Sequence, residues 1–254
     1  MAATAHSFNI GSFRCTIASD GTLVPGDGGD PLGLNFLLID TGEAKILIDT
    51  GCGEGFQTTA GTLVSNLKTA GISPADVDII LFSHGHMDHV LGAFDRYHKP
   101  VFINARYVAT RIEWDHWVAG PGTDELQNMF FEPARDYLVK LRDKFDLVDT
   151  NASVRAGVRL HPAPGHTPGN VTVDIASASS RLFCIGDIIH SPKELTDLRY
   201  LSRVDVEPEL AVTTRENVFS ELAASGTLVF ACHFTFPGLG YITLQNGVLN
   251  WQAA

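Results

Sequence analysis

The sequence contains little cysteine, no long apolar run and a shortage of positive charge, and each shortage excludes a class of protein. The four cysteines of the 254-residue chain are scattered and form no C-x-x-C pair. This pattern predicts reduced, buried thiols and excludes a disulfide framework. No run of about 18 apolar residues is present, so no membrane-spanning helix is expected. The cysteines are Cys15, Cys52, Cys184 and Cys232.

The charge balance is acidic, with 18 Lys and Arg against 29 Asp and Glu, a formal net charge of −11. This balance opposes binding to nucleic acid or anionic lipid, because no basic run supplies phosphate contacts. Two bound divalent cations would offset part of the charge. The N-terminal residues have no basic region followed by an apolar stretch, so no secretory leader is visible and a cytoplasmic location is predicted.

The order of apolar patterns predicts the fold class. No repeat, low-complexity tract or linker divides the chain, so residues 1–254 are predicted to form a single domain. Strand patterns come first and helical patterns are interleaved later, which predicts an α+β fold of two mixed sheets packed face to face with helices outside. A Rossmann fold is the main rival, but no G-x-G-x-x-G follows the first strand. The expected strands are 8–18, 34–40, 44–49, 101–103, 146–149, 158–161, 171–175, 181–185, 227–231 and 241–244, with a turn at 40–43, and the expected helices are 58–70, 105–117, 124–142 and 207–224.

Residues 83–89, S-H-G-H-M-D-H, place three imidazoles and a carboxylate within six residues. Neither the helical nor the strand period brings all four side chains to one face, whereas a loop wrapped around metal does. The apolar run 78–82 just before them reads as a buried strand. The loop is therefore expected at the carboxyl end of a core strand, where α/β sheets place their sites. The candidate ligands are His84, His86, Asp88 and His89.

Three further ligand-type residues each stand alone beside a predicted strand. His166 lies in the Pro/Gly-fixed loop 164–169, Asp187 follows the strand 181–185, and His233 follows the strand 227–231. Five His and two Asp exceed the needs of one four-coordinate zinc, so two divalent ions are predicted. Imidazole and carboxylate without thiolate favour zinc, with manganese, cobalt or iron as alternatives, and both cysteines near these strands read as core residues. The division is His84, His86 and His166 at one ion, Asp88, His89 and His233 at the other, and Asp187 as the bridging carboxylate.

The motif H-x-H-x-D-H, followed by single His, Asp and His residues, resembles the metallo-β-lactamase superfamily from Asp49 to His233. The resemblance implies a four-layer αββα sandwich, the metallo-β-lactamase fold, with a dinuclear site between the sheets. Asp49 matches the early acid of the family, which supports a ligand histidine from behind. That role fits the general need to orient metal-bound imidazoles, and a turn or strand-end cap is the other interpretation.

A second resemblance is to the methyl parathion hydrolase and quorum-quenching lactonase branch. It involves the residues S-D-G-T at 19–22, the long interval between His89 and His166, and H-F-T-F-P-G at 233–238, where Thr235 departs from the Pro of many relatives. The resemblance implies a homodimer and helices that cover an apolar pocket, which would suit a hydrophobic ester, lactone or aryl leaving group. Ordinary packing or a dimer contact explains the aromatic residues equally well. A structural role explains His190 equally well. The pocket candidates are Trp114, Trp117, Phe130, Phe131, His190 and Phe234.

The predicted function is hydrolysis of a small-molecule lactone, ester or organophosphate-like substrate by a metal-bridging hydroxide. Two ions joined by Asp187 would lower the pKa of the water, and Asp88 is the candidate to carry the proton to the leaving group. No G-x-S-x-G elbow surrounds Ser83, so water is the expected nucleophile. The alternatives are a mononuclear iron persulfide dioxygenase, a glyoxalase II-like thioesterase, a β-lactamase and a non-catalytic metal-bound sensor.

Overall fold

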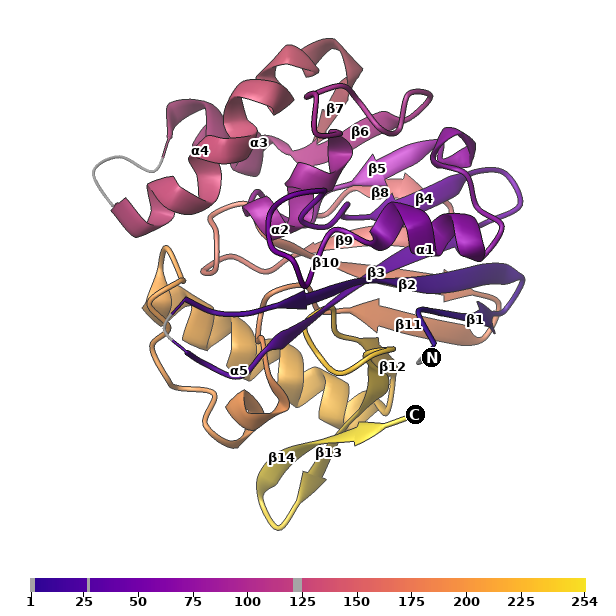
Figure 1. Cartoon of the computed structure of the whole chain (residues 1–254). Helices are drawn as coiled ribbons and strands as arrows, with labels where there is room; N and C mark the ends of the chain where they lie inside the picture. The colour runs from indigo at the N-terminus through magenta and orange to yellow at the C-terminus, as the bar shows by residue number, and fades with distance from the viewer. Residues whose placement is uncertain (1–2, 27, 121–124) are drawn as a thin grey trace.

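The computed structural model describes residues 3–26, 28–120 and 125–254, without some side chains of the helix α4. Two seven-stranded sheets pack face to face, with helices on the outer face of each (Figure 1). The helices α1 (Leu63–Thr69), α3 (Arg111–Ala119) and α4 (Glu125–Lys140) lie on the side of the first sheet, and α5 (Pro208–Ser225) lies on the side of the second. This arrangement confirms the predicted αββα sandwich.

The N-terminal half of the chain builds the first sheet, in the order β1-β2-β3-β4-β5-β6-β7. Its first four strands pair antiparallel, and the strands from β4 to β7 run parallel. The predicted turn at 40–43 joins β3 to β4. The strands are β1 (Ala5–Ile10), β2 (Phe13–Leu23), β3 (Leu32–Asp40), β4 (Lys45–Ile48), β5 (Ile79–Leu81), β6 (Arg106–Thr110) and β7 (Phe145–Val148).

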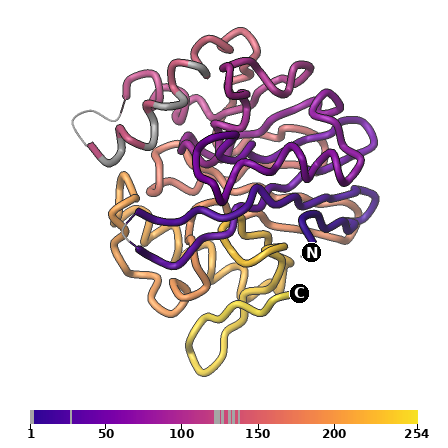
Figure 2. The backbone as a smooth tube through the Cα atoms, in the orientation of Figure 1, coloured from indigo at the N-terminus to yellow at the C-terminus, as the bar shows by residue number. Residues whose placement is uncertain are grey.

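The C-terminal half builds the second sheet, in the order β14-β13-β12-β11-β10-β9-β8, and the colours of Figure 2 separate the two halves. All pairs are antiparallel except β11 with β12. The strands are β8 (Ser153–Arg155), β9 (Val158–Pro162), β10 (Val171–Ser177), β11 (Ser180–Cys184), β12 (Leu228–Phe230), β13 (Leu239–Gln245) and β14 (Val248–Ala253).

The core follows from the alternation of side chains along the strands. On β3, Leu37 and Ile39 face the second sheet, whereas Phe36 and Leu38 face the helices. Strands buried on both faces need such continuous apolar runs. The cluster between the sheets draws residues from both halves of the chain, and the single domain over residues 1–254 stays a prediction.

Four predicted elements differ from the structure. The strand 8–18 is a hairpin, because Gly11 adopts a φ of 56° and turns the chain between β1 and β2. Residues 105–117 divide into β6 and α3, since Thr110 caps the helix with its side chain. The helix expected at 58–70 begins only at Leu63, where the Asp20 carboxylate accepts the backbone N–H. Residues 101–103 form no strand.

The four cysteines are free and buried, as predicted. Among the residues that the structure describes, no helix has the length and apolarity needed to cross a membrane.

Candidate metal centre

The predicted ligands come together where strands of both sheets end. The loop after β5 brings His84 and His86, and the short helix α2 (Met87–Val90) that follows it brings Asp88 and His89. The loop between β9 and β10 brings His166, and the ends of β11 and β12 bring Asp187 and His233. All seven side chains are buried. Positions separated by up to 149 residues in the sequence therefore share one buried cluster.

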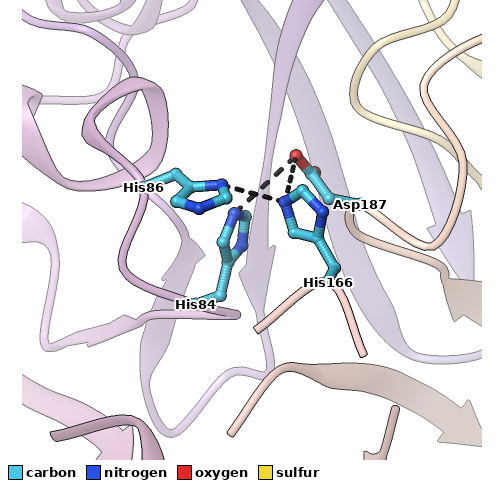
Figure 3. A group of neighbouring side chains, drawn as sticks. All are labelled: His84, His86, His166 and Asp187. Atoms are coloured by element: carbon cyan, nitrogen blue, oxygen red, sulfur yellow. Dashed lines mark hydrogen bonds and ion pairs between the residues drawn. The ribbon is translucent and has the colours of Figure 1, made fainter. Parts of the chain in front are cut away.

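The first group consists of His84, His86, His166 and Asp187, whose candidate ligand atoms all lie within 4.8 Å of one another (Figure 3). His166 Nε2 lies 2.9 Å from His86 Nδ1 and 3.6 Å from Asp187 Oδ2. His84 Nε2 lies 3.7 Å from the same carboxylate oxygen. Three imidazoles and one carboxylate in this arrangement match the donor set of a four-coordinate zinc or a related ion.

The second group consists of His89, His233, Asp187 and Cys232. Asp88 lies beside it, with Oδ2 3.6 Å from His89 Nε2 and 3.7 Å from His233 Nε2. The Cys232 thiol lies 3.3 Å from Asp187 Oδ1, whereas the imidazoles approach Oδ2. Burial raises the pKa of Cys232 to about 12, so this thiol stays protonated and donates to the carboxylate. Asp187 belongs to both groups, and its role as a bridging ligand stays a prediction.

In three of these histidines, the ring nitrogen that points away from the cluster contacts a partner. His89 Nδ1 donates to Asp49 Oδ2 at 2.9 Å, and His233 Nδ1 donates to the carbonyl of Gly33 at 3.0 Å. His84 Nδ1 contacts Ser83 Oγ at 3.0 Å, which itself donates to Asp49 at 2.7 Å. Such contacts fix the tautomer and leave the inner nitrogen free to bind metal. Asp49 thus makes the contact that its expected orienting role requires, and reaches two rings.

His166 has the most elaborate support, and the residues that supply it were not predicted. Its Nδ1 donates to the buried Asp205 at 3.0 Å, and Asp205 accepts from Arg215 at 3.2 Å. Arg215 also donates to the carbonyls of Leu198 and Tyr200. A signal for Arg215 exists in the sequence, because it interrupts an apolar stripe of α5 formed by Ala211, Phe219 and Leu222. Asp205 lies in a loop, where no periodicity marks it.

The electrostatics of the two groups differ. Burial lowers the pKa of His84, His86 and His166, so these rings are neutral, which is the form that binds metal. Burial also disfavours a proton on His89 and His233, but the neighbouring acidic groups, with Asp187 the strongest of them, together raise both pKa values well above their ordinary range. The cluster therefore favours a cation next to Asp187.

The residues fit a pair of metal ions. His84 Nε2 is buried and has no hydrogen-bond partner among the described residues, although a buried polar atom without a partner is costly. A metal ion at the first group would satisfy it. The donor set, imidazole and carboxylate, is the one that zinc and the neighbouring transition metals use.

The expected pocket residues take different positions. His190 lies at the edge of the cluster, with Nε2 3.5 Å from Asp187 and its backbone N–H on the Glu194 carboxylate. Trp114, Trp117 and Phe234 are buried in the apolar clusters beside the sheets. Their role as pocket walls stays a prediction. The side chains of Phe130 and Phe131 lie outside the described residues.

A family model of the metallo-beta-lactamase superfamily matches residues 29–234. The chain belongs to this superfamily. An N-acyl homoserine lactonase of Bacillus sp. is 28% identical over 189 residues, covering 66% of this chain and 68% of the relative. An N-acyl homoserine lactonase of Bacillus thuringiensis is 24% identical over 217 residues, covering 77% and 79%.

The structure also resembles AidC, a dizinc quorum-quenching lactonase solved with a product. The TM-score is 0.91 at 24% identity, and the match covers 100% of this chain and 99% of AidC. Membership of the superfamily, with lactonase relatives and the two groups of candidate ligands, makes the protein a metal-dependent hydrolase.

A substitution at Gly85 tests how tightly the loop that carries His84 and His86 is packed. A Cβ at this position would lie 1.3 Å from Trp117 Nε1, so Gly85→Ala forces a buried indole to move. We expect a loss of about 1–3 kcal/mol in the free energy of unfolding, measured by urea denaturation. Gly26→Ala is the control, because its Cβ meets nothing within 4 Å and should change stability by less than about 0.5 kcal/mol. Equal free energies of unfolding for the two variants would contradict the close contact between Gly85 and the Trp117 indole.

Proposed function

We propose that this metallo-β-lactamase superfamily protein hydrolyses the ester bond of lactones, with two zinc ions held by the seven clustered residues. One observation carries the proposal: imidazole nitrogens of five histidines lie 3.0–3.7 Å from a single oxygen, Oδ2 of Asp187. So many neutral or basic donors around one buried carboxylate oxygen are typical of a shared metal ligand. The histidines are His84, His89, His166, His190 and His233.

In this proposal each group of residues holds one ion. His84, His86 and His166 hold the first, and Asp88, His89 and His233 hold the second, with Asp187 between them. When bound, the ions would lower the pKa of a coordinated water and polarise the substrate carbonyl. The imidazoles are oriented in advance by Asp49, Asp205 and the Gly33 carbonyl, so little reorganisation accompanies binding.

Two side chains at the edge of the cluster are placed to meet the substrate. Those of His190 and Asp88 are 15% and 11% exposed, whereas the histidine ligands are almost fully buried. We assign Asp88 the transfer of a proton to the departing alkoxide, and His190 a hydrogen bond to a substrate oxygen. The Glu194 carboxylate accepts from the backbone of His190 and from the Tyr200 hydroxyl, which fixes the segment that carries the ring.

The substrate class follows from the relatives. The similar curated proteins are N-acyl homoserine lactonases, and AidC is described as a lactonase. A cyclic ester with an acyl chain also suits the chemistry of the proposed site, because hydrolysis opens the ring without a leaving group that must diffuse away. Zinc is the metal we propose, since the imidazole and carboxylate donors favour it.

The proposal is tested by hydrolysis of N-hexanoyl homoserine lactone by the zinc-loaded protein, followed by release of acid at constant pH. We expect kcat/KM for the lactone to exceed that for a nitrophenyl ester and for a phosphotriester. Removal of the metal with a chelator should abolish turnover, and returning zinc should restore it. Turnover of the phosphotriester or of a glutathione thioester without turnover of the lactone would contradict the substrate assignment. Consumption of oxygen with a persulfide and iron would contradict the reaction class.

A further inference from the structure

Glu113, on the first turn of α3, is a buried carboxylate that joins two of the loops that carry the proposed metal ligands. Its side chain accepts four hydrogen bonds, two on each oxygen. Oε1 accepts from the Gly85 backbone at 2.8 Å and from the Trp117 indole at 3.0 Å. Oε2 accepts from the Thr167 hydroxyl at 2.7 Å and from the Gly169 backbone at 3.0 Å. Hydrogen bonds to a carboxylate are about twice as strong as those between neutral groups.

These partners lie next to three proposed ligands of the first metal ion. Gly85 stands between His84 and His86, in the loop that follows β5 of the first sheet. Thr167 follows His166, in the loop between β9 and β10 of the second sheet. The two loops come from different sheets and from positions about 80 residues apart, so no local structure fixes their relative position.

The close packing around Glu113 leaves little room for the two loops to move. Gly169 approaches α3 so closely that a Cβ there would lie 2.2 Å from the Glu113 backbone nitrogen. The Thr110 hydroxyl accepts from that nitrogen and donates to the Gly169 carbonyl. Glu113 itself is 1% exposed. A carboxylate with all its acceptor sites occupied and no access to water determines where its donors lie.

We propose that Glu113 is a positioning residue for the first metal ion, because its carboxylate holds the loop of His84 and His86 against the loop of His166. This inference rests on the proposed function, since it assigns a support to three of the proposed ligands. The ligands of the second ion have other supports: His89 donates to Asp49, and His233 donates to the Gly33 carbonyl. Loss of Glu113 therefore affects the two ions unequally.

The test is stepwise zinc binding by the metal-free wild-type protein and by the variant Glu113→Gln, measured by calorimetry with a competing chelator. Glutamine has the same shape but presents an NH2 group to two of the four donors, so it cannot satisfy them. We expect the affinity for one zinc ion to fall by about 10–100-fold, the usual effect of losing a partner behind a ligand. The affinity for the other zinc ion should stay at the wild-type value.

Asp20→Asn is the matched control, because Asp20 is also a buried carboxylate that accepts two backbone N–H groups, from Cys52 and Leu63. This variant should bind both zinc ions as the wild type does, even where its unfolding midpoint is lower. Thr167→Val removes only one of the four donors and should weaken the same zinc ion by a smaller factor. It also keeps the test decisive if Glu113→Gln does not fold.

The outcomes separate the inference from the proposed function. Wild-type affinities for both ions in Glu113→Gln and Thr167→Val, or equal weakening of both ions, would overturn the positioning role alone. A wild-type protein that binds fewer than two zinc ions would overturn the proposed function, and the inference with it.

Discussion

Replacing Asp187 by asparagine is expected to lower kcat on a lactone by at least about 100-fold, and to reduce the zinc content of the purified protein. Asparagine keeps the shape of the side chain but removes the negative charge that five imidazoles surround. The loss is on the scale seen when charge in the transition state loses a support.

The measurement is turnover and metal content on the same samples, compared with Asp174→Asn. Asp174 is a carboxylate of the same sheet that pairs with Arg181 at 2.6 Å, away from the ligand cluster. That variant should keep its zinc and its turnover. Full metal occupancy and unchanged kcat in Asp187→Asn would contradict the bridging assignment.

Replacing Arg215 by methionine is expected to cost about 3–5 kcal/mol in the free energy of unfolding. Arg215 and Asp205 are both 1% exposed, and their ion pair lies behind the metal candidate His166. Without the guanidinium, the buried Asp205 carboxylate loses its ion pair and keeps the hydrogen bond from the imidazole of His166. The guanidinium also lies 4.3 Å from the ring of Tyr200, so packing is lost together with charge.

Urea denaturation of the metal-free protein measures this loss, and Arg199→Met supplies the comparison. Arg199 also pairs with a carboxylate, that of Glu216 at 2.6 Å, but its side chain is 80% exposed. Exposed pairs contribute about 0–1 kcal/mol because water and salt screen them. If the two arginine variants lost equal stability, the buried pair could not be the support of His166 that we infer.

The fold and most of the cluster were predictable because their signals are local. The ligands follow apolar strands closely in the sequence or lie in a Gly/Pro loop, and sites form where strands end. The hairpin at Gly11 and the division of residues 105–117 into a strand and a helix could not be predicted from the apolar pattern. A single glycine and the cap at Thr110 decided those boundaries, and neither changes the apolar pattern much.

The supports of the ligands were much harder to predict. Glu113 lies beside two tryptophans on a short helix, where a carboxylate ordinarily faces solvent, and its partners come from loops distant in the sequence. Asp205 contacts His166 only because the loop before α5 packs against it, and no local pattern marks this contact. Asp49 was predicted from a resemblance, and its contact through Ser83 to a second histidine was visible only in the structure.

We propose that one carboxylate, that of Asp187, joins two metal ions in a single centre. Crystals of the zinc-loaded protein, with anomalous diffraction recorded on both sides of the zinc absorption edge, test it most directly. We expect two zinc peaks, one among His84, His86 and His166 and one among Asp88, His89 and His233, with Asp187 in contact with both. A single peak, or two peaks of which only one touches Asp187, would contradict it.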